Sequence, residues 1–182
     1  MRKQIGEYWV SLHRDIPITV YEGMLSVFCL GVVVIIAFYG LKCGWRKIAG
    51  LLLVEYIFLL FCSTVFFRQT VESRGHNFTP FWSYTAIQEG RAELLPENVM
   101  NVAVFIPIGI LLGSLLRVKS AWLITLIVGL GISVSIEALQ YFFHRGFAET
   151  DDVMHNTLGC VIGNGLFVLA KQIARISLIK QI

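Results

Sequence analysis

The sequence predicts an all-α integral membrane protein, built as a bundle of about five transmembrane helices. Hydrophobic residues make up 56% of the 182 residues, and the mean hydropathy is +0.71, a balance that an ordinary water-facing domain does not have. Five apolar stretches each come close to the roughly 20 residues that cross a bilayer as a helix. They are residues 20–41, 48–67, 99–116, 121–143 and 153–170.

Each of the first three stretches has a feature that bears on this prediction. Stretch 20–41 is too long for a signal-peptide core and has no small-residue cleavage site, so we interpret it as a membrane span. Stretch 48–67 contains one carboxyl group, Glu55, which we assign to a packing hydrogen bond. Stretch 99–116 contains Pro107, which lacks an amide N–H and predicts a kink that either serves packing alone or points at a polar pocket.

Pairs of glycines four residues apart occur in two of the stretches. They are Gly109 with Gly113, and Gly159 with Gly163. Small residues at this spacing let membrane helices approach closely. We expect such contact to bring Asn101, Glu137 and Asn156 near one another. The same surfaces could equally support a dimer, so the oligomeric state stays open.

Basic residues predict the orientation of the chain. They follow the first, third and fifth stretches without acidic neighbours, at Lys42, Arg46, Lys47, Arg117, Lys119, Lys171, Arg175 and Lys180. By the positive-inside rule these segments are cytoplasmic, and the loops 68–98 and 144–152 face outside. The predicted organisation is an extracytoplasmic segment 1–19, a membrane domain 20–170 and a basic amphipathic cytoplasmic tail 171–182. Arg2, Lys3 and Arg14 in the outer segment oppose this orientation.

The loop 68–98 contains an aromatic run, residues 78–84. Trp82 and Tyr84 suit the membrane interface, where amphipathic rings are enriched. We therefore hypothesise that part of this loop lies on or re-enters the outer leaflet as a lid.

Polar residues within and between the apolar stretches form the candidate functional site. Ionisable groups near hydrocarbon are costly, and proteins retain them mainly where they form pairs or have a function. They are Asn98, Asn101, Glu137, Gln140, Arg145, Asp151, Asp152 and Asn156. Helical spacing places Glu137 and Gln140 on one face, and Asp152 and Asn156 on another. All members except Asn98 are predicted to bind a ligand.

Asp151 and Asp152 directly precede the apolar part of the last stretch. A carboxylate there can cap the helix and meet the positive end of its dipole, and we favour this role for Asp151. Arg145 is the only basic residue of the same short loop. We expect Arg145 to pair with Asp152, or the two residues to bind a zwitterionic head group together.

Several classes of function have little support in the sequence. His76, His144 and His155 lack the spacing of known metal ligands, and there is no GxSxG elbow or phosphate-binding glycine loop, so we expect no metal or cofactor. The net charge of +3 comes without a nucleic-acid-binding signature. An enzyme is not excluded: Glu137 or Asp152 could be the general base of a membrane-embedded hydrolase or transferase.

Four separated runs of the sequence resemble, in order and spacing, the successive motifs of the VanZ-like family. They are residues 77–81 (NFTPF), 98–109 (NVMNVAVFIPIG), 135–141 (SIEALQY) and 145–159 (RGFAETDDVMHNTLG). The chain departs from the family pattern at Glu149, where Asp is common, and at His155, where an aliphatic residue is common. The resemblance, to the family of the teicoplanin resistance protein, implies a bacterial plasma-membrane protein that lowers sensitivity to lipoglycopeptides.

The interpretation that we favour is an outward-facing polar pocket that binds an amphipathic envelope molecule. A membrane lipid, a lipid-linked head group or a lipoglycopeptide would fit. Arg145 would meet a phosphate or carboxylate, while the carboxyl and amide groups of the site would orient the remaining polar groups. The alternatives are the membrane-embedded enzyme and a structural scaffold in which every polar residue is replaceable.

Overall fold

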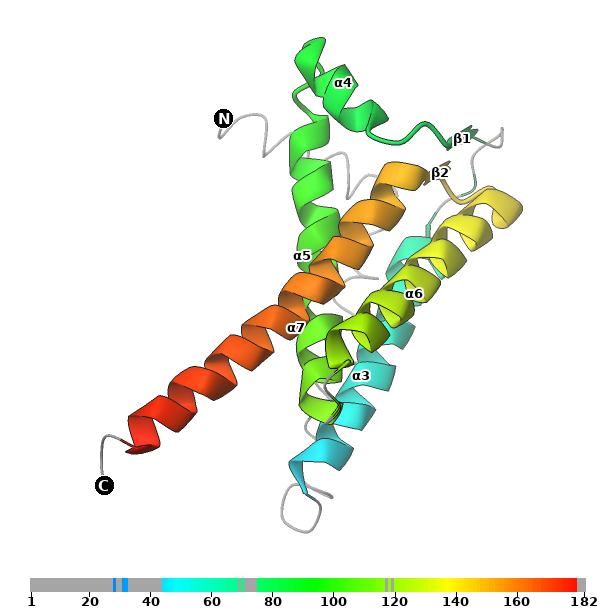
Figure 1. The fold of residues 1–182 in the computed structure, drawn as a ribbon. Helices are drawn as coiled ribbons and strands as arrows, with labels where there is room; N and C mark the ends of the chain where they lie inside the picture. Colours follow the sequence, from blue (N-terminus) through cyan, green and yellow to red (C-terminus); the bar gives the residue numbers. More distant parts are fainter. Residues whose placement is uncertain are drawn as a thin grey trace.

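The computed structural model describes residues 28, 31–32, 44–68, 70, 75–116, 118 and 120–179 (Figure 1). Four helical segments within these residues are long and apolar enough to cross a membrane. They are Trp45–Phe66, Leu94–Leu115, Ala121–Phe143 and Thr150–Ser177. The prediction of a helical membrane protein is therefore confirmed, while the predicted span 20–41 lies almost wholly outside the described residues.

The membrane helices are joined by two short strands and one short helix. In chain order the elements are α3 (Trp45–Phe61), a π-helical turn η1 (Cys62–Phe66), β1 (Gly75–Asn77), α4 (Trp82–Gln88), α5 (Leu94–Leu115), α6 (Ala121–Phe143), β2 (Phe147–Glu149) and α7 (Thr150–Ile179). β1 and β2 pair in parallel, with Gly75 opposite Phe147 and Asn77 opposite Glu149. The sequence did not predict these strands, because three residues are too few to show an alternating pattern.

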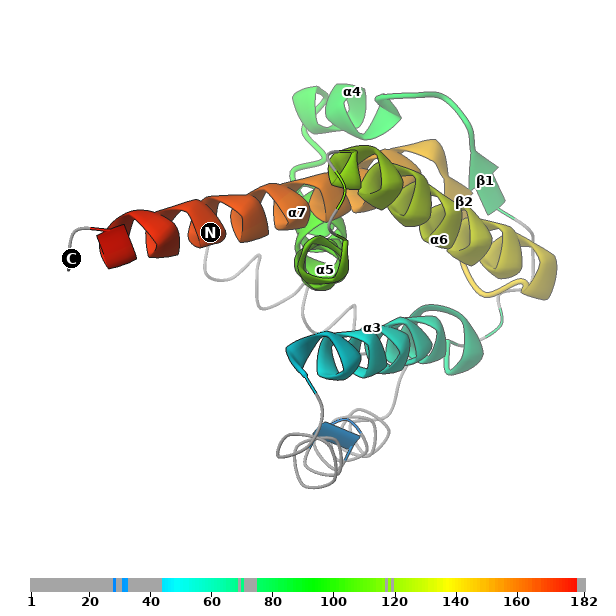
Figure 2. The same cartoon turned by 60° about the horizontal axis from the view of Figure 1, so that its bottom comes forward.

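α5 is the centre of the bundle. α7 packs chiefly on α5 and then on α6, while α3 packs on α5 from another side. Figures 1 and 2 show α7 crossing α5 obliquely, so that the C-terminal part of α7 extends away from the other coloured helices. α4, β1 and β2 lie together at one end of the bundle, which is the upper end in Figure 1.

Glycines allow α5 and α7 to touch through their backbones. A Cβ atom added at Gly163 would lie 2.1 Å from the carbonyl oxygen of Ile106, and one at Gly159 would lie 2.1 Å from that of Val102. On α5, a Cβ at Gly109 would lie 2.0 Å from the carbonyl oxygen of Cys160. The close contact predicted from the glycine spacing is confirmed, and it joins these two helices.

Buried amides join α7 to α6. Asn156 donates from Nδ2 to Ser133 Oγ at 2.8 Å, and two turns later Asn164 donates to Thr125 Oγ1 at 2.8 Å. All four side chains are buried. Hydrogen bonds between membrane helices favour one packing arrangement, because an unpaired amide would otherwise face hydrocarbon.

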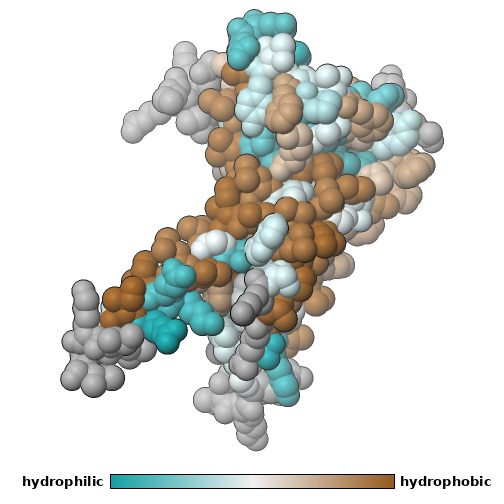
Figure 3. All heavy atoms as spheres, viewed as in Figure 1, coloured by the Kyte–Doolittle hydropathy of each residue, from teal (hydrophilic) through white to brown (hydrophobic). Residues whose placement is uncertain are grey.

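The outer surface of the bundle is largely apolar. Figure 3 shows hydrophobic side chains across the middle of the molecule, with hydrophilic ones near α4 at the top and in smaller groups toward the lower end. Large side chains that point outward include Val54 on α3, Ile127 on α6 and Leu169 on α7, each more than half exposed. Such a surface is typical of a protein whose solvent is lipid.

Two helix boundaries differ from the predicted ones in ways that affect the site. α5 begins at Leu94 rather than at residue 99, so Glu97 and Asn98 lie in its first turns. α7 begins at Thr150 and continues to Ile179, so most of the predicted tail 171–182 is a continuation of the last helix. Hydropathy alone places helix ends poorly where polar residues belong to the helix.

Candidate functional site

The predicted polar residues gather at the end of the bundle that carries α4, β1 and β2. Residues 75–93 and 144–149 lie together there, as predicted from charge (Figure 1). Arg46 and Lys47, at the start of α3, and Lys171, near the end of α7, lie toward the opposite end. The two ends of the bundle therefore differ in charge.

Asp151 is the anchor of the short helix α4. Its carboxylate accepts hydrogen bonds from the amide of Phe81 at 2.6 Å, the amide of Ser83 at 2.9 Å and the hydroxyl of Ser83 at 2.5 Å. Ser83 Oγ in turn accepts a hydrogen bond from Asn98 Nδ2 at 3.0 Å. Asp151 thus caps α4 across the fold, whereas the sequence predicted that it would cap its own helix. The first backbone N–H groups of a helix have no partner within that helix, and one carboxylate can accept hydrogen bonds from several of them. This explains why Asp151 binds the start of α4.

A second hydrogen bond holds α4 against α7. Tyr84 OH lies 2.8 Å from His155 Nε2, and the two rings are 5.6 Å apart between centroids. His155 stands where the VanZ-like pattern commonly has an aliphatic residue. In this chain the histidine gives Tyr84 a polar partner that an aliphatic side chain could not provide.

The three residues expected to meet one another have separate partners instead. Asn101 donates to Asp152 Oδ1 at 2.7 Å, which joins α5 to α7. Glu137 accepts the amide N–H of Glu149 at 2.9 Å, which fixes β2 to α6. Asn156, one turn further along α7 than Asp152, donates to Ser133 Oγ instead. Helical spacing placed these residues on the correct helices, but their partners depend on the tertiary packing.

Arg145 does not form the predicted pair with Asp152. Its guanidinium donates to the backbone carbonyl of Phe66 at 3.2 Å and to that of Arg68. These carbonyls lie at the last residue of η1 and two residues beyond it, where the helical hydrogen bonds end, and a guanidinium with five N–H donors can satisfy both. The interaction with Asn101 leaves Asp152 paired to an amide. Arg145 therefore fastens the chain after α3 to the loop before β2.

Gln140 has a similar tethering role. It is buried, and its Nε2 donates to the carbonyl of Thr64 at 3.0 Å. Thr64 lies in the π-helical turn, where Ser63 and Thr64 both donate their hydroxyls to the carbonyl of Leu60. A π-helical turn leaves a backbone carbonyl without a helical partner. Here that carbonyl, of Thr64, accepts the hydrogen bond from the side chain of Gln140.

An acidic cluster lies at the same end of the bundle, within electrostatic range of Arg68. Its members are Glu97, Glu137, Glu149 and Asp152, from α5, α6, β2 and α7. Asp152 interacts electrostatically with the other three carboxyl groups, and Arg68 opposes the negative charge of all four. The guanidinium of Arg68 lies against Gly146, where an added Cβ atom would be 2.9 Å from it.

Arg68, Glu97 and Glu149 are functional candidates that the sequence reasoning missed. Glu97 is next to Asn98, and Glu149 lies within the last family motif, so both were close to predicted positions. Arg68 lies at the start of a long loop, far along the chain from α7. Its position beside the cluster follows from the return of the chain through β1, which no local pattern indicates.

The one cluster carboxyl outside the membrane-spanning segments, Glu149, titrates unusually. Burial raises the pKa of Glu149 to about 7, and the negative charges of Glu97 and Asp151 act in the same direction. The indole N–H of Trp82 and the charge of Arg68 oppose this rise. A carboxyl group with such a pKa exchanges its proton near neutral pH.

This pKa predicts that the protein loses stability as the pH rises. In the unfolded chain Glu149 deprotonates near its ordinary value of 4.5, whereas the folded protein holds the proton until about 7. Between these values the native state binds more protons, so its stability falls with rising pH. Allowing for partial exposure of the side chain, we expect a loss of roughly 1–2 kcal/mol between pH 5 and 7.5. Melting curves in detergent should show a smaller pH dependence for Glu149→Gln, and an unchanged slope would contradict the assignment.

Comparison with known proteins gives one match. The family model described as VanZ/LLP1 matches residues 27–171, a range that includes the acidic cluster, Arg68 and α4. No curated protein and no solved structure matches the chain. Among the described residues, no three His, Cys, Asp or Glu side chains are placed to share a metal ion.

Proposed function

This chain belongs to the VanZ/LLP1 family, and from that premise we propose that it binds the polar head group of an amphipathic molecule of the bacterial envelope. The proposed binding site is the acidic cluster with Arg68, facing the outer side of the plasma membrane. One observation carries the proposal: carboxyl groups from four elements lie within electrostatic range of one another and of Arg68 at one end of a membrane bundle. Ionisable groups at such depth generally mark a binding or reaction site.

The composition of the cluster suggests the chemistry of the ligand. Carboxyl groups of Asp152 and Glu149 would accept hydrogen bonds from amines or hydroxyls, and Arg68 would meet a phosphate or carboxylate. Arg68 takes the role that the sequence suggested for Arg145, whose guanidinium is held through Nη1 by two backbone carbonyls. A zwitterionic or sugar-bearing head group on a lipid or a lipoglycopeptide combines both kinds of polar group.

Helix α4 supports an interfacial position for the site. Phe78, Phe81 and Tyr84 are 64%, 55% and 46% exposed around it, as expected for aromatic side chains at the head-group level. The basic residues at the opposite end support an outward orientation of this face by the positive-inside rule. In that position α4 would lie over the cluster in contact with arriving amphipathic molecules.

Drug susceptibility tests the proposal. In a sensitive Gram-positive host, the wild type is expected to raise the inhibitory concentration of teicoplanin more than that of vancomycin, which lacks the lipid chain. Asp152→Ala and Arg68→Gln should each remove most of this protection, because each removes a ligand group. Glu89→Gln is the matched control, since Glu89 is an exposed carboxyl beyond the end of α4. Immunoblots of the membrane fraction check that expression is equal.

Each result has a defined meaning. Equal protection from the wild type and both variants would exclude the cluster as the site. No protection by the wild type at equal expression would remove lipoglycopeptides as ligands. Envelope lipids would then be tested directly, by asking whether a head-group lipid copurifies with the wild type and not with Asp152→Ala.

A membrane-embedded hydrolase or transferase is the second candidate, and the titration of Glu149 favours it. A carboxyl group whose pKa is about 7 can both accept and donate a proton at neutral pH, which suits general acid–base catalysis. Glu137 accepts the backbone amide of the same residue, and the two carboxyl groups lie within electrostatic range of each other. Mass spectrometry of envelope lipids separates the candidates. Covalent change that appears with the wild type and is lost in Glu137→Gln would indicate an enzyme.

A further inference from the structure

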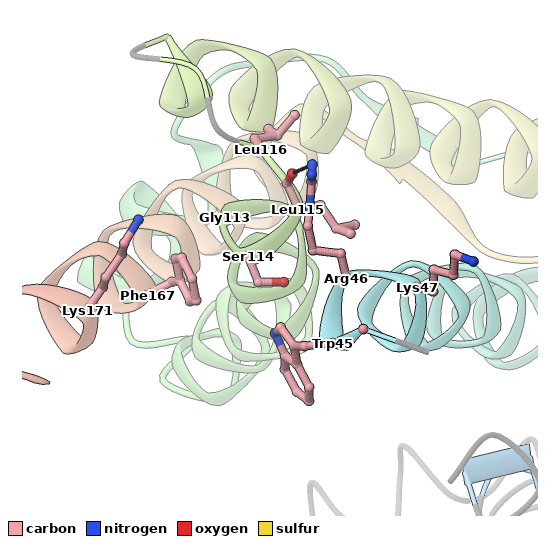
Figure 4. Close-up of a pocket in the computed structure, with 10 residues that line it drawn as sticks. Trp45, Arg46, Lys47, Gly113, Ser114, Leu115, Leu116, Phe167 and Lys171 are labelled. Carbon is pink, nitrogen blue, oxygen red and sulfur yellow. Dashed lines mark hydrogen bonds between the residues drawn. The ribbon is translucent and has the colours of Figure 1, made fainter. Parts of the chain in front are cut away.

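A cavity opens at the end of the bundle opposite the acidic cluster. It has a volume of about 780 Å³ and lies between the start of α3, the end of α5 and the second half of α7 (Figure 4). Trp45, Gly113 and Phe167 contribute to its walls. Gly113 brings α7 close to α5 here, because an added Cβ atom would lie 3.0 Å from the ring of Phe167. A volume of this size accommodates a ligand of several polar groups.

Three basic side chains line the cavity from two helices. Arg46 and Lys47 come from α3, and Lys171 comes from α7, one turn after Phe167. Figure 4 shows Arg46 and Lys171 on opposite sides of the end of α5. Arg46 donates to the carbonyl of Leu115 at 2.6 Å, which holds the guanidinium in place while leaving other N–H donors available.

No acidic residue is available nearby along the chain to neutralise these cations. The segments 44–54, 110–125 and 153–182 contain no Asp or Glu, while Arg117 and Lys119 follow the end of α5 in the sequence. Among the described residues that line the cavity, three are basic and none is acidic, so this lining is positively charged. Such a basic recess between membrane helices attracts anionic groups.

Exposed tryptophans at this end of the bundle indicate a lipid rather than a soluble anion. Trp45 is 61% exposed at its mouth, and Trp122, at the start of α6, is 56% exposed near the same end. Exposed tryptophans of this kind lie at the head-group level of a bilayer. A ligand here would meet cations and aromatic surface together, as the phosphate and glycerol of a phospholipid do.

We propose that this cavity, lined by Arg46, Lys47 and Lys171, binds the head group of an anionic phospholipid. The three cations of the lining attract the phosphate, and Trp45 and Phe167 offer apolar surface to the glycerol backbone. The bound lipid bridges α3 and α7, which meet α5 from different sides. This site is separate from the acidic cluster and does not depend on the function proposed for it.

Native mass spectrometry of the full chain tests the proposal. Delipidated protein in detergent is mixed with equal amounts of phosphatidylglycerol and phosphatidylcholine that carry the same acyl chains. The wild type should retain phosphatidylglycerol preferentially. Each cation removed is expected to lower this preference roughly fivefold, so that the double variant Arg46→Gln/Lys171→Gln loses most of it. Lys171→Arg keeps the charge and should keep the preference.

Controls separate this site from general charge attraction. Arg175→Gln removes a cation one turn further along α7, outside the cavity, and should leave the preference intact. If Arg175→Gln loses as much as Lys171→Gln, or the double variant keeps the preference, the proposal is wrong. Displacement of the lipid by millimolar inorganic phosphate would also overturn it, because it would indicate a site for free anions. The single variant Lys171→Gln remains a valid test if the double variant fails to fold.

Discussion

Replacing Gly163 with alanine is expected to destabilise the protein by roughly 2–4 kcal/mol, a large effect for one methyl group. The added Cβ would lie 2.1 Å from the carbonyl oxygen of Ile106 and 3.0 Å from Cα of Gly109. Both are backbone atoms, so no side chain can move aside to make room. α5 and α7 would have to separate, and the contact that dominates the bundle would weaken along its length.

Gly165 provides the control on the same helix. A Cβ added there meets nothing within 4 Å, and alanine is the better helix former, so Gly165→Ala should be neutral or stabilising by up to about 1 kcal/mol. The buried thiols of Cys62 and Cys160 permit a direct measurement. Their reaction with a fluorogenic maleimide during heating reports unfolding, in a background where Cys29 and Cys43 are serine. Equal melting temperatures for the two glycine variants would contradict the close backbone contact.

The membrane helices and their closest contact could be predicted because both follow from strong local constraints. A helix in lipid needs about 20 apolar residues, and stretches 48–67, 99–116 and 121–143 have that length. Close approach of two helices needs small residues at helical spacing, and α5 and α7 both carry glycine pairs. Neither feature depends on which residues lie across the interface.

The parts that could not be predicted depend on contacts between distant segments. β1 and β2 are three residues each and form only because the long loop returns beside the loop after α6. The cap on α4 comes from Asp151, 68 positions from Ser83. Sequence spacing offers no signal for either contact, since each partner is ordinary in its own surroundings.

The same distinction applies to the candidate site. The sequence identified Asp152 and Glu137 because carboxyl groups beside apolar stretches are rare and stand out. It paired Asp152 with the nearest cation along the chain, Arg145. In the structure the guanidinium of Arg145 binds the carbonyls of Phe66 and Arg68, and Arg68 is the cation within electrostatic range of both carboxyl groups. Short distance along the chain was a poor guide to the partner of a charged group in this fold.

Asp151→Ala is expected to release helix α4 from the bundle, with a loss of roughly 2–4 kcal/mol in local stability. The carboxylate is 1% exposed and accepts three hydrogen bonds from Phe81 and Ser83. Removing it leaves two backbone N–H groups without a partner. Phe81 also has a positive φ of 62°, an uncommon conformation that this interaction helps to hold.

Hydrogen exchange separates this local effect from general unfolding. Amides of α4 should exchange about 30 to 1000 times faster in Asp151→Ala, while amides in the middle of α6 keep their wild-type rates. Ser83→Ala is the graded control, since it removes the hydroxyl between Asp151 and Asn98 but leaves both backbone bonds to the carboxylate. Its effect on α4 should therefore be clearly smaller. Unchanged protection of α4 in Asp151→Ala would contradict this role and mean that the contact between Tyr84 and His155 suffices to hold the helix.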